Sequence, residues 1–143
     1  MKRYSYEEVL EQCVGLINEC VEMDGRLPVP YGELTAFCYN TPPVTQFIRN
    51  HTDGMTEEQQ VEFSEQLDKD ILTAVLGVEK ATRIIIGERI TQLRYDKGLT
   101  QAQLAELCGM KQQNIARIEA GTHSTGVDVL SRIADVLGTK LDL

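Results

Sequence analysis

Residues 99–121, LTQAQLAELCGMKQQNIARIEAG, restrict the possible folds more than any other stretch of the chain. Thr100, followed three residues later by Gln103, forms a capping box, which marks the start of a helix. The helical spacing of apolar residues breaks at Gly109, and glycine readily adopts the positive φ that ends a helix. The stretch therefore predicts two short helices, at about 101–108 and 111–120, joined by a tight turn.

The second of these helices has a polar face opposite its apolar one. The residues on that face are Lys111, Gln112, Gln113, Asn114 and Arg117. Long side chains with amide or guanidinium groups can hydrogen bond to base edges in the major groove of DNA. The alternative interpretation is an ordinary solvated helix face.

The pattern resembles the helix-turn-helix of the phage repressor/Cro class, the Xre family of transcriptional regulators. The residues that carry the resemblance are Gln101, Ala105, Gly109, Ile115, Ile118, Glu119 and Gly121. The similarity continues over about residues 86–137, and it does not extend to residues 1–80, whose family the sequence does not indicate. The resemblance implies a lambda-repressor-like helical domain that binds double-stranded DNA.

The resemblance also implies roles for individual residues. Gln112, Gln113 and Arg117 fall at the positions where the family reads bases. Residues expected to contact the DNA backbone are Gln101, Lys111, Asn114, Thr122, His123, Ser124 and Thr125. In this family an arginine and a glutamate at the places of Arg94 and Glu119 form a buried structural ion pair. Lys111 replaces the usual Ser or Thr at the start of the recognition helix, so the capping oxygen is missing.

The charge of the chain is unevenly distributed. The formal net charge is −8, but residues 1–80 hold 6 basic and 15 acidic side chains, and residues 81–143 hold 8 and 7. The acidity therefore belongs to the front half, and the rear half is close to neutral. Phosphate attraction is modest, so we expect specific binding to need a dimer and to weaken steeply with salt.

The front half reads as a helical domain of its own. Capping boxes at Ser5 and Thr56 open long helices that run to about residues 24 and 76, with shorter helices expected at about 33–39 and 44–50. The side chains expected to face inward from the second long helix are Val61, Leu67, Ile71, Leu72 and Val75. Gly77 is a plausible hinge, so we expect an acidic helical domain over residues 1–77 and a helix-turn-helix domain over residues 78–143.

The rear half is expected to begin and end with further helices. The first spans about 79–97 and the last follows a loop at 121–125. The side chains expected to face inward from the last helix are Val127, Leu130, Ile133, Ala134 and Leu137. Family members commonly add a short helix that pairs two subunits, whereas here only residues 140–143 follow, with an alternating pattern suited to a short strand. We therefore expect residues 1–77 to form the homodimer.

The acidic helix at about 57–76 has two interpretations. Its carboxylates form either a solvated face or a docking surface for a basic protein partner.

The cysteine spacing and the lack of catalytic or metal-ligand motifs limit the classes of protein to which this chain can belong. The four cysteines form no C-x-x-C pair, and each lies in an apolar pattern, so we expect buried, reduced thiols in a cytoplasmic protein. Glu7, Glu8 and Glu11 follow the basic N-terminal residues, so we do not expect these residues to act as a signal peptide, and no stretch is apolar over the length of a membrane span. No catalytic or metal-ligand pattern is present, so we expect neither an enzyme nor a bound cofactor or metal.

The sequence thus predicts an all-α regulator that binds a palindromic operator as a dimer, with repression the commoner outcome in the family. One alternative is the antitoxin of a toxin–antitoxin pair, in which the acidic N-terminal region holds a basic toxin. Another is a protein-interaction module whose helix-turn-helix does not bind DNA, which the low charge of the rear half favours.

Overall fold

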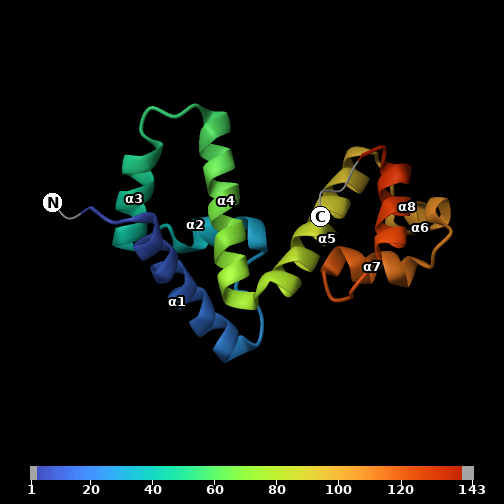
Figure 1. The fold of residues 1–143 in the computed structure, drawn as a ribbon, viewed down its shortest axis with the longest axis horizontal. Helices are drawn as coiled ribbons and strands as arrows, with labels where there is room; N and C mark the ends of the chain where they lie inside the picture. Colours follow the sequence, from blue (N-terminus) through green and yellow to red (C-terminus); the bar gives the residue numbers. More distant parts are fainter. Residues whose placement is uncertain (1–2, 140–143) are drawn as a thin grey trace. The chain divides into compact units, whose positions relative to one another are not determined.

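The computed structural model describes residues 3–139, and all regular secondary structure among them is helical. The chain divides into two compact units, Met1–Val78 and Glu79–Leu143 (Figure 1). The first contains α1 Tyr6–Asp24, the 3-10 helix η1 Tyr31–Glu33, α2 Leu34–Cys38, α3 Pro42–Thr52 and α4 Glu57–Leu76. The second contains α5 Val78–Asp96, α6 Gln101–Cys108, α7 Gln112–Ala120 and α8 Val127–Leu137. The predicted all-α fold class is confirmed.

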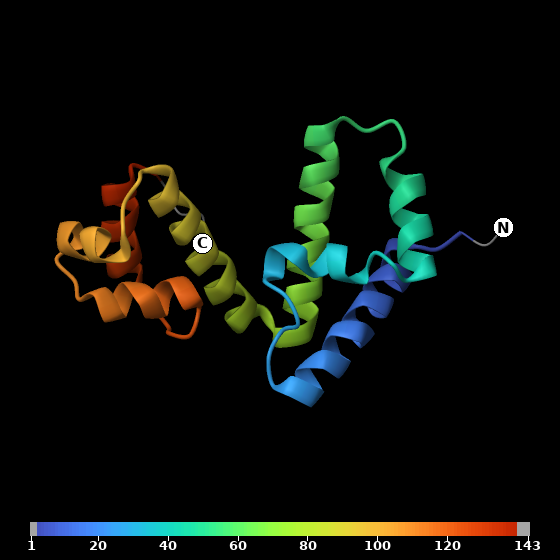
Figure 2. The same cartoon turned by 180° about the vertical axis from the view of Figure 1, so that it is seen from behind.

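The first unit is built around the two long helices α1 and α4, which pack against each other in both views (Figures 1 and 2). Both helices begin at the predicted capping boxes, with the side chains of Ser5 and Thr56 accepting N–H groups of the first turn. The buried side chains at this interface include Val9, Cys13, Ile17, Leu67, Ile71 and Leu72. The tyrosine hydroxyl of Tyr6 also donates to the carboxylate of Asp70, which joins the start of α1 to α4.

A buried carboxylate joins α2 to α4. Asp68 is 3% exposed, and its Oδ1 accepts the backbone N–H of Thr35 at 2.7 Å. Burial raises the pKa of Asp68, and hydrogen bonding from Thr35 opposes that shift.

Two expectations for the first unit need correction. Helix α3 begins at Pro42 rather than Val44, because proline lacks only an N–H that the first helical turn leaves unbonded anyway. Val61, expected to face inward, is 55% exposed, because the first turns of α4 border an open groove. Val75 is half-buried, whereas Leu67 and the two residues at 71–72 are buried as predicted.

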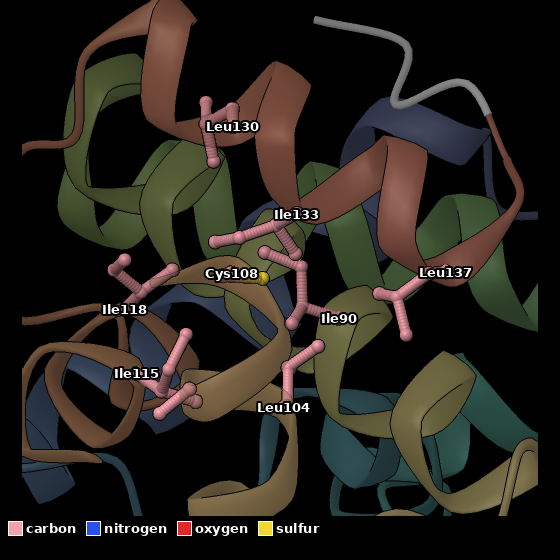
Figure 3. Close-up of a cluster of buried hydrophobic side chains, with 9 residues drawn as sticks. Ile90, Leu104, Cys108, Ile115, Ile118, Leu130, Ile133 and Leu137 are labelled. Carbon is pink, nitrogen blue, oxygen red and sulfur yellow. The ribbon is translucent and has the colours of Figure 1, made fainter. Parts of the chain in front are cut away.

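The second unit has one apolar core, to which all four of its helices contribute. The side chains that meet in Figure 3 are Ile90, Leu104, Cys108, Ile115, Ile118, Leu130, Ile133 and Leu137. Val127, expected inward, is 62% exposed because it is the first residue of α8 and lies before the turns that reach the core. Gly138 ends α8 with φ 69°, the left-handed conformation in which glycine commonly follows a helix. The expected strand at 140–143 lies outside the described residues.

All four cysteines are free, and three of them, Cys13, Cys38 and Cys108, are buried. Cys20 is only half-buried, so the expectation of burial holds for the other three. No helix among residues 3–139 combines the length and apolar character needed to cross a membrane. Within the same residues, histidine, cysteine and carboxylate side chains form no cluster that could hold a metal ion.

Candidate nucleic-acid interface

The turn between α6 and α7 is set by local hydrogen bonds. The Thr100 side chain accepts the Gln103 N–H at 3.1 Å, and the Gln103 side chain accepts the Thr100 N–H at 2.9 Å, which fixes the start of α6. At the other end, Gly109 takes the left-handed conformation with φ 67°, and the Met110 N–H returns to the Ala105 carbonyl at 2.8 Å. The chain therefore reverses within a few residues, and α7 packs against α6.

Helix α7 separates its apolar and polar residues. Ile115 is fully buried and Ile118 is 6% exposed, and both point into the core (Figure 3). Gln112, Gln113, Asn114 and Arg117 are exposed, as is Lys111, the residue before the helix. The Lys111 side chain makes no capping bond, in line with its departure from the family pattern. The structure thus places the predicted base-reading residues together on one accessible face.

The C-terminal end of α7 carries a buried carboxylate with four hydrogen bonds. Glu119 Oε2 accepts Arg94 Nε at 2.8 Å, and Oε1 accepts Arg94 Nη2 at 2.9 Å. Oε1 also accepts the Thr91 hydroxyl at 3.0 Å and Gln101 Nε2 at 3.2 Å. The Arg94 and Glu119 side chains are 7% and 5% exposed. These bonds tie the end of α7 to α5 and to the first residue of α6.

Arg94 has a further partner outside this pair. Its Nη1 donates to the Leu99 carbonyl at 2.9 Å, which fixes the connection between α5 and α6. The hydrogen bond to Glu119 raises the pKa of Arg94, so the guanidinium stays charged. The arginine and glutamate that the family resemblance pairs are therefore in direct contact.

The residues expected to contact the DNA backbone have different surroundings. Gln101 is half-buried, and its side-chain amide donates to Glu119 Oε1 at 3.2 Å. In the loop after α7, Thr122, His123 and Ser124 are exposed and Thr125 is half-buried. The Thr122 N–H donates to the Arg117 carbonyl at 3.2 Å, so this loop starts directly at the end of α7.

Sequence reasoning missed two residues that contact this end of α7. A Cβ placed on Gly87 would lie 2.4 Å from the Ile118 carbonyl oxygen and 2.5 Å from that of Glu119. Helix α7 therefore lies directly against the backbone of α5, as the two helices show in Figure 2. Thr91, one turn later on α5, is the second missed residue. A glycine inside a helical pattern was the available signal for the close approach.

Comparisons with known proteins agree with this geometry. A family model described as helix-turn-helix matches residues 90–143. An uncharacterized HTH-type transcriptional regulator, y4dJ, from Sinorhizobium fredii is 33% identical over 58 residues, which cover 41% of this chain and 75% of that protein. The chain belongs to the helix-turn-helix family. Its helix-turn-helix domain is of the Xre, or Cro/C1, type, and the predicted family is confirmed.

A second relative is named as an antitoxin. Antitoxin HicB 1 from Photorhabdus laumondii subsp. laumondii is 40% identical over 48 residues, or 34% of this chain. The match spans about a third of that antitoxin, 31% of its length. No solved structure matches the chain.

Proposed function

We propose that this protein is a sequence-specific DNA-binding transcriptional regulator that acts by binding rather than by catalysis. The observation that carries the proposal is the exposed face of α7, where Gln112, Gln113 and Arg117 project together while Ile115 and Ile118 anchor the helix in the core. Membership in the helix-turn-helix family supports the same function.

In the proposed complex, α7 lies in the major groove. The amides of Gln112 and Gln113 pair with adenine N6 and N7, and the Arg117 guanidinium pairs with guanine O6 and N7. Contacts to phosphates position the domain without specifying sequence. The residues proposed for those contacts are Gln101, Lys111, Asn114, Thr122, His123, Ser124 and Thr125.

The regulator is proposed to work as a cytoplasmic homodimer. Two recognition helices about 34 Å apart would enter successive major grooves of a pseudo-palindromic operator, and occupancy of promoter DNA would repress transcription. We assign dimer formation to residues 1–77. The assignment rests on the apolar pattern of residues 1–77, because both units expose large apolar side chains, among them Met23 at 84% in the first and Leu107 at 60% in the second.

Selection from a library of random duplexes tests this function. The full chain is incubated with the library at about 0.15 M salt, where the Debye length is about 8 Å, and bound duplexes are sequenced. We expect an enriched palindrome with half-sites about one helical turn apart. Enrichment of no motif would contradict DNA reading, and a single asymmetric half-site would contradict the dimer.

A second candidate function is that of an antitoxin, with DNA binding retained and a basic toxin held by the first unit. The match to Antitoxin HicB 1 favours it. An open groove of about 1040 Å³ beside α4 also favours it, since carboxylates surround the exposed Val61 there. The carboxylates that line this groove are those of Glu57, Glu58, Glu62, Glu65 and Asp68. A basic protein surface would complement such a groove.

Co-expression with a small basic protein encoded beside the gene tests the antitoxin function. We expect the two proteins to purify together, and the double variant Glu58→Lys and Glu62→Lys to lose the complex. The matched control is Glu19→Lys with Glu22→Lys, because these exposed glutamates lie on α1 away from the groove lining. Equal retention of the partner by both double variants would contradict the proposed docking site.

A further inference from the structure

The hydroxyl of Thr91, on α5, reaches a side-chain carboxylate of another helix. Its Oγ1 lies 2.9 Å from the Gly87 carbonyl in its own helix and 3.0 Å from Glu119 Oε1 at the end of α7. A hydroxyl has one proton and therefore donates to one acceptor at a time. The carboxylate is the stronger acceptor because it is charged. The Thr91 hydroxyl therefore donates its hydrogen bond to Glu119 Oε1.

The hydrogen bond from Thr91 to Glu119 lies next to a close approach between the backbones of α5 and α7. Gly87 lies one turn before Thr91, and the carbonyls of Ile118 and Glu119 pass so close to it that no Cβ would fit. The same segment of α5 thus contacts both the backbone of α7 and, through Thr91, the Glu119 side chain. The other donors to Glu119, Arg94 and Gln101, lie later in the chain, at the end of α5 and the start of α6.

We propose that Thr91 is a positioning residue that sets the orientation of the recognition helix α7, an inference that rests on the proposed function of DNA reading. Arg94 and Gln101 hold Glu119 from the end of α5 and the start of α6, and Thr91 holds it from the part of α5 one turn after Gly87. Without the hydroxyl, Glu119 loses one of its four hydrogen bonds, and the end of α7 can shift about the Arg94 pair. Arg117 lies two residues before Glu119, so such a shift displaces a proposed base-reading side chain.

The test compares Thr91→Val, which removes the hydroxyl at nearly constant shape, with Thr91→Ser, which keeps it. The matched control is Thr73→Val on α4, because the Thr73 hydroxyl bonds only the carbonyl four residues earlier, at 2.8 Å from Lys69. Each full-length variant is assayed for affinity to the selected duplex and to a scrambled duplex, at a temperature where circular dichroism shows it folded. Amide hydrogen exchange is followed at residues 118–121.

We expect Thr91→Val to lower affinity for the selected duplex by about three- to tenfold, the range of one net hydrogen bond. Affinity for the scrambled duplex stays unchanged, because phosphate contacts tolerate a small shift of α7. Exchange at residues 118–121 accelerates. Thr91→Ser keeps the wild-type affinity for the selected duplex and the wild-type exchange at residues 118–121. Thr73→Val changes neither the affinity nor the exchange.

Unchanged exchange at residues 118–121 in Thr91→Val would overturn the proposal, and so would an equal loss of affinity for both duplexes. If the wild-type chain enriches no duplex, the proposed function fails. The exchange measurement then still decides whether Thr91 positions α7.

Discussion

Arg94 and Glu119 form a two-pronged ion pair, with Nε to Oε2 at 2.8 Å and Nη2 to Oε1 at 2.9 Å. The pair joins α5 to the end of α7 across 25 residues of sequence, and its side chains are 7% and 5% exposed. Planar, bidentate geometry of this kind is among the stronger side-chain interactions, and its partners cannot be replaced by water where they are buried. The orientation of the proposed recognition helix therefore depends on a charge pair that itself makes no base contact.

Glu119→Ala is expected to lower the free energy of unfolding by about 3–5 kcal/mol, because it leaves the Arg94 guanidinium buried without its counterion. Urea denaturation followed by circular dichroism measures this change, and DNA affinity should fall with it. Glu106→Ala is the control, since Glu106 is an exposed glutamate on α6. Similar urea midpoints for both variants would show that the pair does not hold the domain together.

Gly87→Ala is expected to destabilise the helix-turn-helix domain, because the added Cβ would lie 2.4 Å from a backbone oxygen that cannot move independently. Overpacking of this kind costs about 1–3 kcal/mol, and the backbone contact favours the upper end. Gly15→Ala on α1 meets nothing within 4 Å. This control should instead stabilise the first unit by about 0.5–1 kcal/mol, the helix preference of alanine over glycine. A neutral Gly87→Ala would mean that α5 and α7 are further apart than the structure shows.

Asp68 predicts a definite pH dependence of stability. Burial raises its pKa in the folded state above the unfolded value of about 3.9, so the folded state binds its proton more tightly. Its contribution is fully present below about pH 4 and is lost as the pH rises through the folded pKa. Asp68→Asn removes the ionisation, so the stability of the variant relative to wild type should increase between about pH 4 and 7.

Urea midpoints measured across that pH range check this, with the exposed Glu58→Gln as the control. A relative stability that stays flat, or falls as the pH rises, would contradict the assigned shift of the Asp68 pKa.

The burial of three of the four cysteines predicts that their thiols react at different rates with a labelling reagent. Burial raises the pKa of Cys108, and a hydrogen bond with Cys38 together with burial raises the pKa of Cys13. The same hydrogen bond lowers the pKa of Cys38, but Cys38 is buried like the other two, so reagent access is blocked and all three thiols should react slowly in the folded protein. Cys20 is half-buried and should react first. An aromatic disulfide reagent should therefore titrate one thiol quickly under native conditions and all four in urea. Rapid reaction of more than one thiol in the native protein would contradict the buried positions.

Local signals in the sequence were sufficient for most helix positions. The capping boxes at Ser5, Thr56 and Thr100 and the left-handed glycines at 25, 109 and 138 act through neighbouring residues, so they could be identified without tertiary information. Val61 and Val127 were wrongly placed inside because helical periodicity identifies a face but not how far the packing partner extends along it. Both lie near the start of their helix, beyond the reach of the core.

In the candidate site, too, the sequence predicts features within one helix but not the contacts between helices. The polar face of α7 could be predicted because residues three and four apart share a face of a helix. A glycine inside the helical pattern of α5 signals a close approach at Gly87 but does not identify what approaches it. The role of Thr91 could not be predicted, because it depends on where α5 meets the end of α7. The bond from Gln101 to Glu119 likewise joins residues that only the fold brings together.

The most direct test of the central claim, that α7 reads bases, is a repeat of the duplex selection with Gln113→Ala. Gln66→Ala serves as the control, since Gln66 is an exposed glutamine on α4 in the other unit. If Gln113 reads a base, its variant should keep the wild-type urea midpoint and lose base preference at one position of each half-site, while the control motif stays unchanged. An enriched motif identical to that of the wild type would contradict the account.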